Sequence, residues 1–451
     1  MKIISGSNWQ NKLIAWRHNI KLCLGLIMLM QACVPGGHSQ SGNSSSSSKP
    51  ALVTEDHIYN KNVRTVMLFP HTGQIHDMIQ PPVISLKKST PLILHFDELT
   101  DDAQNYAVKI INCDANWEVS DLPEMQYLSD YNEYLITERK FSFNTRIPFV
   151  HYSFKVPKVK VSGNYLLVVY DEDNPDDLVL TRRFIVFEDQ LSIAPKVQFS
   201  NVTKKRDSHQ QVDFKINYSG LELINPTDEI KVVIRQNHRW DNMITGLKPL
   251  YVREFEKSLD YSFFSGENNF PGGNEFRMFD IRSTQYAQQH IDKIDLKTTP
   301  IEVSLLRDQS RAKRAYGQYE DADGKFYTQH HETQGTKIEP DYVYVNFALN
   351  YPYPREGNVY VVGGMNDWQP KEEFKLVYDE DKKQYRGKAL LKQGFYNYMY
   401  TLIEEGQRDD TFFEGSHSLT QNHYEVLVYY RPMGFRSDQL IGYKNINFNE
   451  L

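Results

Sequence analysis

Cysteines and long apolar runs are both scarce in this sequence. Only three cysteines occur among 451 residues, which excludes a framework of several disulfides, and Cys113 is a lone thiol unless it pairs with Cys33. The apolar run Leu22–Met30 is short, whereas a helix that crosses a bilayer needs about 20 residues. No later run approaches that length, so we expect no membrane-spanning helix downstream.

Acidic residues are absent before Glu55, and the same stretch carries the cations Lys2, Lys12, Arg17 and Lys21. A basic leader followed by a short apolar run and a small residue is typical of a secretory signal peptide, here residues 1–32. Ala32 before Cys33 resembles a bacterial lipobox, which predicts that Cys33 is acylated and becomes the mature N-terminus. The alternative is an ordinary signal peptide in which Cys33 has no role.

Residues 33–55 form a predicted tether. After Cys33 they continue as VPGGHSQSGNSSSSSK, and tracts rich in Gly and Ser behave as flexible coil. Such a segment would link a membrane to a folded body.

The charge balance is acidic. The formal net charge is −7, and removal of the four leader cations lowers it to −11. An acidic chain without a block of Lys and Arg is a poor candidate for binding nucleic acid, so no nucleic-acid partner is expected.

Strand signals recur along the rest of the chain, and its 29 Tyr and 24 Phe favour pleated, half-buried surfaces. We expect an all-β fold of three consecutive immunoglobulin-like β-sandwich domains. Their predicted bounds are 56–190, 191–340 with a Gly-rich insertion, and 341–451 with a C-terminal tail from Met433. The expected strands are Val63–Phe69, Pro91–Phe96, Tyr106–Cys113, His151–Val156, Asn164–Tyr170, Thr181–Phe187, Gln211–Tyr218, Glu229–Asn237, Tyr251–Phe255, Phe276–Ile281, Ile301–Leu306, Lys325–Thr328, Tyr342–Leu349, Asn358–Gly363, Glu373–Asp379, Gln384–Leu391, Tyr396–Ile403 and Tyr424–Arg431.

Motifs that carry catalysis are missing: no HExxH, P-loop, GxSxG elbow or paired CxxC occurs. His330 and His331 are adjacent, so on a strand they would point to opposite faces. Asp114, Asn116 and Glu118 alternate as at the start of a calcium loop, but the Gly and distal Glu of such a loop are missing, which favours a polar turn. We therefore expect no catalytic residue, metal site, cofactor or small-molecule substrate.

The segment Asn358–Tyr400 resembles the glycogen- and starch-binding modules appended to amylase-type enzymes. The matching residues are VYVVGGMNDW at Val359–Trp368 and GFYNY at Gly394–Tyr398. In those modules the tryptophan that matches Trp368 can stack on a sugar ring. The second platform tryptophan of the family has no counterpart in Gly406–Asp410. Trp368 is therefore either a glycan-stacking residue or a packed turn anchor, and the resemblance supports the fold more than the function.

A second resemblance covers nearly the whole mature chain. The order of its segments resembles the plug protein of the type IX secretion system of Bacteroidota. The matching stretches are Asn112–Trp117, Phe141–Thr145, His151–Ser153, Ser162–Tyr165, Thr181–Phe184, Gln236–Asn242 and Gly272–Arg277.

Two of these stretches, together with the neighbouring Phe270, supply candidate residues for binding a protein partner, because aromatic residues and Arg dominate interface hot spots. The candidates are Arg239, Trp240, Phe270, Gly272, Gly273, Asn274, Phe276 and Arg277. Internal packing is the alternative role for the same residues.

The resemblance implies a non-enzymatic plug that binds and occludes the periplasmic opening of a very large outer-membrane barrel, the translocon of the secretion system. It also implies a lipid-anchored location on the periplasmic face of the outer membrane. Val34–Lys49 contains no Asp or Glu, whereas the surface-export signal of Bacteroidota lipoproteins is acidic. The alternative function is a periplasmic glycan-binding lipoprotein that uses Trp368.

Overall fold

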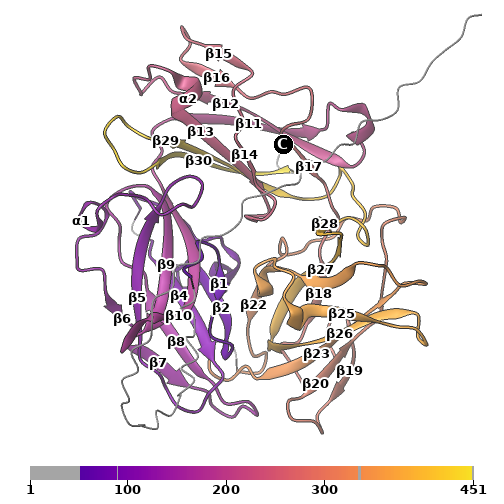
Figure 1. The fold of residues 1–451 in the computed structure, drawn as a ribbon. Helices are drawn as coiled ribbons and strands as arrows, with labels where there is room; N and C mark the ends of the chain where they lie inside the picture. The colour runs from indigo at the N-terminus through magenta and orange to yellow at the C-terminus, as the bar shows by residue number, and fades with distance from the viewer. Residues whose placement is uncertain (1–50, 89, 334–336, 449–451) are drawn as a thin grey trace, which may run out of the picture. The chain divides into compact units, whose positions relative to one another are not determined.

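Strands dominate the computed structural model, which describes residues 51–448 except 89 and 334–336 (Figure 1). The predicted signal peptide, Cys33 and most of the tether lie outside these residues. The helices are single turns: α1 Glu124–Tyr127, α2 Pro226–Glu229, and the 3-10 turns η1 Ile75–Ile79, η2 Thr203–Lys205, η3 Gly364–Asn366 and η4 Glu372–Phe374. In the described part of the chain, no helix has the length and apolar character needed to cross a membrane. The predicted all-β class is confirmed.

Two sheets form the N-terminal sandwich. The first has the order β1-β10-β9-β5-β6 with β3 beside β10, and the second has the order β2-β4-β8-β7. The strands are β1 His57–Ile58, β2 Val63–Pro70, β3 Val83–Ser85, β4 Leu92–Glu98, β5 Tyr106–Cys113, β6 Tyr134–Leu135, β7 Glu138–Phe141, β8 Val150–Lys155, β9 Gly163–Asp171 and β10 Asn174–Phe187. All six strands expected in this segment are present.

The end of the predicted tether belongs to this sandwich. The carbonyl of Thr54 accepts a hydrogen bond from Arg183 Nε at 2.7 Å, and the carbonyl of Glu55 accepts one from Thr181 Oγ1 at 2.6 Å. Backbone that is hydrogen-bonded to β10 is no longer flexible coil, so the folded body begins before residue 56.

The first sheet of the N-terminal sandwich is buried on both faces. Along β9, Tyr165 and Leu167 point into the core of the sandwich, while Leu166 and Val168 enter a second core. The second core also contains Leu427 of the middle sandwich. Burial on both faces explains why β9 is a nearly continuous apolar run rather than an alternating one.

The middle sandwich contains strands from two distant parts of the chain. Its sheets have the orders β11-β12-β16-β15, with β17 beside β12, and β14-β13-β29-β30. In Figure 1 the yellow strands β29 and β30 lie beside β13. The strands are β11 Ser192–Phe199, β12 His209–Asn217, β13 Ile230–Gln236, β14 Ile244–Thr245, β15 Tyr251–Arg253, β16 Ser258–Asp260, β17 Asn269–Pro271, β29 His423–Tyr430 and β30 Gln439–Asn447.

Eleven strands form the C-terminal domain, in one sheet with the order β18-β27-β24-β25-β26-β23-β20-β19 and with β21, β22 and β28 at its sides. The ring of Phe279 on β18 stacks on Tyr396 of β27 at 5.1 Å and meets Phe347 of β23 at 5.8 Å, so the sheet folds over one core. The strands are β18 Arg277–Asp280, β19 Ile291–Asp295, β20 Glu302–Leu305, β21 Asp308–Gln309, β22 Phe326–Thr328, β23 Tyr342–Asn350, β24 Asn358–Val362, β25 Lys375–Asp379, β26 Gln384–Lys392, β27 Gly394–Glu404 and β28 Gln407–Asp409.

The strand pairing differs from the predicted bounds 191–340 and 341–451. Strands β18, β20 and β22, expected in the middle domain, pair within the C-terminal sheet, and β29 pairs with β13 from Ile230↔Tyr430 to Gln236↔Tyr424. The predicted tail from Met433 contains β30. Apolar patterns identify a strand but carry no information about its partner, so these exchanges between sheets were not visible in the sequence.

The three sandwiches share apolar cores. Met67 and Phe69 of β2 belong to the core of the C-terminal sheet, and the second core described above joins the N-terminal and middle sandwiches. The described residues accordingly form one compact unit.

We predict that Leu427→Ala weakens the contact between the N-terminal and middle sandwiches. Leu427 is fully buried in their shared core, and truncation of a buried leucine costs about 2–5 kcal/mol of unfolding free energy. Leu419→Ala is the matched control, because Leu419 is 55% exposed and its loss should change stability by less than about 0.5 kcal/mol. Chemical denaturation measures both; equal stabilities for the two variants would contradict the shared core.

Candidate functional site at the joint between the middle and C-terminal sandwiches

Six of the eight residues proposed for partner binding gather around one open hollow of about 410 Å³. It lies where the middle sandwich meets the C-terminal sheet, and we call it the joint hollow. The six residues are Arg239, Phe270, Gly272, Gly273, Asn274 and Phe276. Arg408 and Asp410, which the sequence did not single out, line it as well.

The turn after β13 places Arg239 at the joint hollow. Asn237 and His238 adopt φ values of 52° and 59°, which reverse the chain where β13 ends. The side chain of Asn237 fixes the turn: its Nδ2 donates to Asn422 Oδ1 at 2.8 Å, and its Oδ1 accepts from the backbone N–H of His423 at 2.9 Å. Asparagine tolerates this left-handed conformation better than most residues.

Two arginines and two aspartates form a charged cluster in the joint hollow. Arg239 donates to Asp241 at 2.6 Å and to Asp410 at 2.7 Å, and Arg408 contacts the same two carboxylates at 2.8 and 2.7 Å. Burial raises the pKa of Asp410, but the two guanidinium groups outweigh it and lower this pKa to about 2. Arg239 itself is 6% exposed. No sequence signal distinguishes Asp410 from its neighbour Asp409.

The glycines of the insertion permit a close approach of two backbones. A Cβ on Gly272 would lie 2.0 Å from the carbonyl oxygen of His417, and Gly273 has a φ of +65°. Asn274 Nδ2 donates to the carbonyl of Glu414 at 2.9 Å. The insertion is therefore attached to residues 414–417 of the same chain.

Arg277 is held by a second buried network. It pairs with Asp308 at 2.7 Å and with Glu414 at 2.9 Å, and the hydroxyls of Tyr398 and Tyr400 donate to Asp308. Asp308 and Glu414 were missed in the sequence because their contacts join residues far apart in the chain.

The aromatic candidates are also internal. Phe270 is 2% and Phe276 7% exposed. Trp240 does not line the joint hollow. The centroid of its ring lies 4.9 Å from that of Trp117, and the Arg235 guanidinium lies 4.0 Å from the same ring. The side chains of Phe270, Phe276, Arg239 and Arg277 have too little exposed surface to contact a partner, so the structure favours the alternative role, internal packing, for them.

Trp368 is a packed turn anchor. Its side chain is 9% exposed, the Arg239 guanidinium lies 4.2 Å from its ring centroid, and the Phe276 ring lies at 5.4 Å. A Cβ on Gly324 would come within 2.0 Å of the indole. A sugar ring needs an open aromatic face, which Trp368 does not offer, so of the two alternatives for this residue the structure favours the packed turn anchor.

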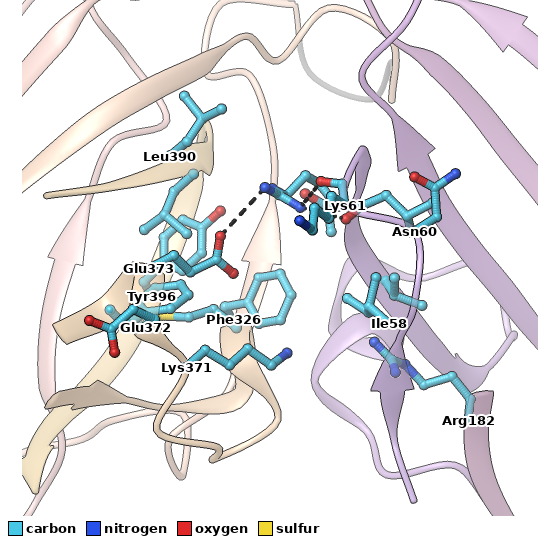
Figure 2. A pocket seen from close by; sticks show the side chains of 17 residues that line it. Ile58, Asn60, Lys61, Arg182, Phe326, Lys371, Glu372, Glu373, Leu390 and Tyr396 are labelled. Carbon is cyan, nitrogen blue, oxygen red and sulfur yellow. Dashed lines mark hydrogen bonds and ion pairs between the residues drawn. The ribbon is translucent and has the colours of Figure 1, made fainter. Parts of the chain in front are cut away.

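A second hollow, of about 460 Å³, lies between the N-terminal sandwich and the C-terminal sheet (Figure 2). Asn60, Lys61 and Arg182 line it from one side, and Lys371, Glu372 and Glu373 from the other. Arg64 reaches across to Glu373 at 3.5 Å, and this ion pair is the contact drawn to Glu373. The pair is half-exposed and so contributes little to stability.

Cys113 and the acidic turn Asp114–Glu118 both have structural roles. Cys113 is buried, and burial raises the pKa of its thiol to about 12, which makes the reactive thiolate scarce. Asp114 Oδ1 accepts the backbone N–H groups of Asn116 and Glu118 at 2.9 and 3.1 Å, the geometry of a polar turn. Among the described residues, no group of three His, Cys, Asp or Glu is placed to hold a metal ion.

The described residues thus define an all-β protein of fused sandwiches. The family model for the first domain of the type 9 secretion system plug protein matches residues 63–188, which span the N-terminal sandwich from β2 to β10. The N-terminal sandwich therefore belongs to the family of first domains of type 9 secretion system plug proteins.

A solved structure, that of a hypothetical protein from Parabacteroides merdae, is similar over a longer range. The TM-score is 0.82 at 31% sequence identity, and the match covers 88% of this chain and 100% of that one. No curated protein matches. The likeness extends beyond the first domain to most of the described residues.

We predict that Arg239→Gln destabilises the protein by about 3 kcal/mol, because it leaves Asp410 and Asp241 with one guanidinium instead of two. The pKa of Asp410 lies below that of an unfolded aspartate, so its contribution is present above about pH 4 and is lost as the pH falls towards about 2. The variant should lose stability at neutral pH and show a shallower pH dependence between about pH 4 and 2. Urea denaturation at several pH values measures both effects.

Arg436→Gln is the control, because Arg436 is exposed. A neutral-pH stability of Arg239→Gln equal to that of this control would show that the charged cluster does not hold the joint.

We predict that Trp368→Ala lowers stability by about 3 kcal/mol, the usual cost of removing a buried tryptophan, without affecting any glycan binding. Affinity electrophoresis in a glycogen gel should retard neither the wild-type protein nor the variant. Retardation of the wild type that disappears in Trp368→Ala would restore the glycan-binding alternative.

Proposed function

We propose that this protein is a non-enzymatic plug that binds and occludes the periplasmic opening of the type IX secretion translocon, a large outer-membrane barrel. The observation that carries the proposal is the family match over residues 63–188. A plug acts by steric exclusion, and the shared cores of the three sandwiches supply the rigidity that such a mechanism needs.

We infer that the barrel contacts a surface other than the joint hollow. The Gly-rich insertion and Arg239 are committed to contacts inside the chain, so the partner must use side chains that remain exposed. Large exposed apolar residues occur on all three sandwiches, and they include Met125, Tyr131, Phe143, Phe255, Tyr353 and Val377. Scattered apolar side chains in a polar surround suit a reversible contact, which a plug that must also leave the channel requires.

Anchoring is the second part of the proposal. Acylated Cys33 and the tether that follows it would hold the body at the periplasmic face of the outer membrane. A flexible link raises the effective concentration of the plug near the barrel, so modest contacts suffice to keep the opening filled.

The plug proposal predicts that the barrel co-purifies with this chain from envelopes in mild detergent. Deletion of the gene should make the envelope leaky to large antibiotics only while the barrel is present, because the opening is otherwise absent. Purification of the barrel without this chain, together with unchanged permeability after deletion, would refute the assignment.

Cys33→Ser separates anchoring from plugging in the same experiment. The variant should leave the membrane fraction, because acyl chains contribute about 0.8 kcal/mol per buried CH₂, and leakage should be partial rather than complete. Membrane retention of the variant would contradict the anchor alone and leave the plug proposal standing.

A further inference from the structure

The hairpin of β15 and β16 carries the densest group of exposed apolar side chains in the described part of the chain. Four of the six residues 250–255 are large, apolar and exposed, namely Leu250, Tyr251, Val252 and Phe255. The Phe255 side chain is as exposed as in an extended chain, at 107%. Single exposed apolar residues are ordinary, but several on one short element mark a site of interaction.

Hydrogen bonds fix this hairpin on the middle sandwich. The Lys257 N–H donates to the Glu254 carbonyl at 3.1 Å and Lys257 adopts a φ of +44°, which closes the turn between the two strands. At the base, the Lys257 carbonyl accepts from the Tyr218 N–H at 2.9 Å, and Leu259 of β16 is fully buried in the core of the middle sandwich. The exposed side chains therefore stand on a preformed element, so little chain entropy is lost when a partner binds them.

The loop before α2 lies beside the same hairpin. Lys257 Nζ pairs with Glu222 at 2.8 Å, which joins the two segments. Farther along the loop, the Glu229 carboxylate accepts the Ile224 N–H at 3.0 Å, and the Ile224 side chain is exposed. In Figure 1, β15, β16 and α2 lie together at the top, on the side of the middle sandwich away from β9 and β27. We call Ile224, Leu250, Tyr251, Val252 and Phe255 the apolar tip.

One carboxylate at the apolar tip is left without an ion pair. Arg253 lies 3.7 Å from Glu256, so these two charges offset each other. Glu254, exposed beside Phe255, forms no ion pair with the residues that the structure describes. Burial of Phe255 against a partner would take the Glu254 carboxylate out of water, and a cation or N–H donors from the partner must then compensate it.

The carboxylate favours a protein over a bilayer as the partner. The hydrocarbon of a membrane offers no hydrogen-bond donor, so a carboxylate next to an inserted ring is costly there. A protein recess can supply both an apolar floor for Phe255 and a cation at its rim for Glu254. Tyrosine and arginine, present here as Tyr251 and Arg253, are also enriched among the residues that dominate protein interfaces.

We propose that the apolar tip is the docking element of the plug, which inserts Phe255 into an apolar recess at the periplasmic opening of the barrel and places Glu254 against a barrel cation. The inference rests on the proposed plug function and names the surface that makes the contact. A projecting, preformed hairpin suits this role because the opening presents a recess to the body that fills it. The middle sandwich is therefore the domain that faces the barrel.

Binding of the mature, full-length protein to the isolated barrel tests the proposal. The tagged barrel comes from cells that lack this chain, so its opening is free, and biolayer interferometry in mild detergent gives the affinity. Phe255→Ser should weaken binding at least about tenfold, because an aromatic anchor dominates the energy of an interface. Tyr353→Ser removes an exposed ring between β23 and β24 of the C-terminal domain; this matched control should bind as the wild type does.

Glu254→Lys tests the charge. Against a barrel cation, the introduced lysine should weaken binding more than Glu254→Gln does, and the difference should shrink as the salt concentration rises. Glu405→Lys, exposed at the turn between β27 and β28, is the control and should leave binding unchanged. Because all of these positions are exposed, each variant should keep the unfolding temperature of the wild type.

The outcomes separate this inference from the function on which it rests. Failure of the wild-type protein to bind the barrel refutes both. Wild-type binding that Phe255→Ser leaves unchanged, or that Tyr353→Ser weakens equally, refutes the docking element alone and leaves the plug proposal standing.

Two other occupants of the apolar tip have their own signatures, and either one would overturn the docking element. A bilayer is the occupant if the Cys33→Ser protein sediments with phosphatidylcholine vesicles and Phe255→Ser abolishes this. A second copy of the chain is the occupant if light scattering shows an oligomer that Phe255→Ser converts to a monomer.

Discussion

The first sheet of the N-terminal sandwich is the element on which the rest of the molecule depends, because both of its faces are buried. One face packs against β2, β4 and β8 in the core of its own sandwich, and the other packs against β13, β29 and β30 of the middle sandwich. Because apolar residues are buried at both faces of this sheet, the N-terminal and middle sandwiches pack together as one unit. A third contact, from β2 into the core of the C-terminal sheet, adds the remaining domain.

Buried charges hold the joints between these domains in a defined arrangement. Lys392 of β26 pairs with Asp97 of β4 in another sheet. Arg239, after β13, pairs with Asp410, and Arg277 of β18 pairs with Glu414, both in the segment between β28 and β29. Such pairs add little net stability compared with apolar contacts of the same size, but breaking one leaves a buried charge alone. Misaligned domains are therefore strongly disfavoured, and the plug that we propose would keep one shape under load.

The sequence predicted the strands well and their partners poorly. Continuous apolar runs such as Asn164–Tyr170 and the polar loop after it gave β9, β10 and their hairpin, because side-chain pattern and turn chemistry are local. The pairing of β13 with β29 joins residues about two hundred positions apart, and Asp410 lies 171 positions from its partner Arg239. For the same reason the sequence left Trp368 and the Gly-rich insertion open between a binding role and internal packing, and the structure packs both inside the joint.

The late arrival of β29 and β30 has a consequence for how the protein matures. Strand β13 pairs with β14 on one side and with β29 on the other, and β29 is synthesised about two hundred residues after β13. Until then the middle sandwich lacks half of one sheet, and the apolar face that meets β9 lacks Leu427 and Tyr429. A chain interrupted before residue 423 would expose that unfinished edge to proteases and chaperones. The middle sandwich is therefore complete only in a chain that extends through β30.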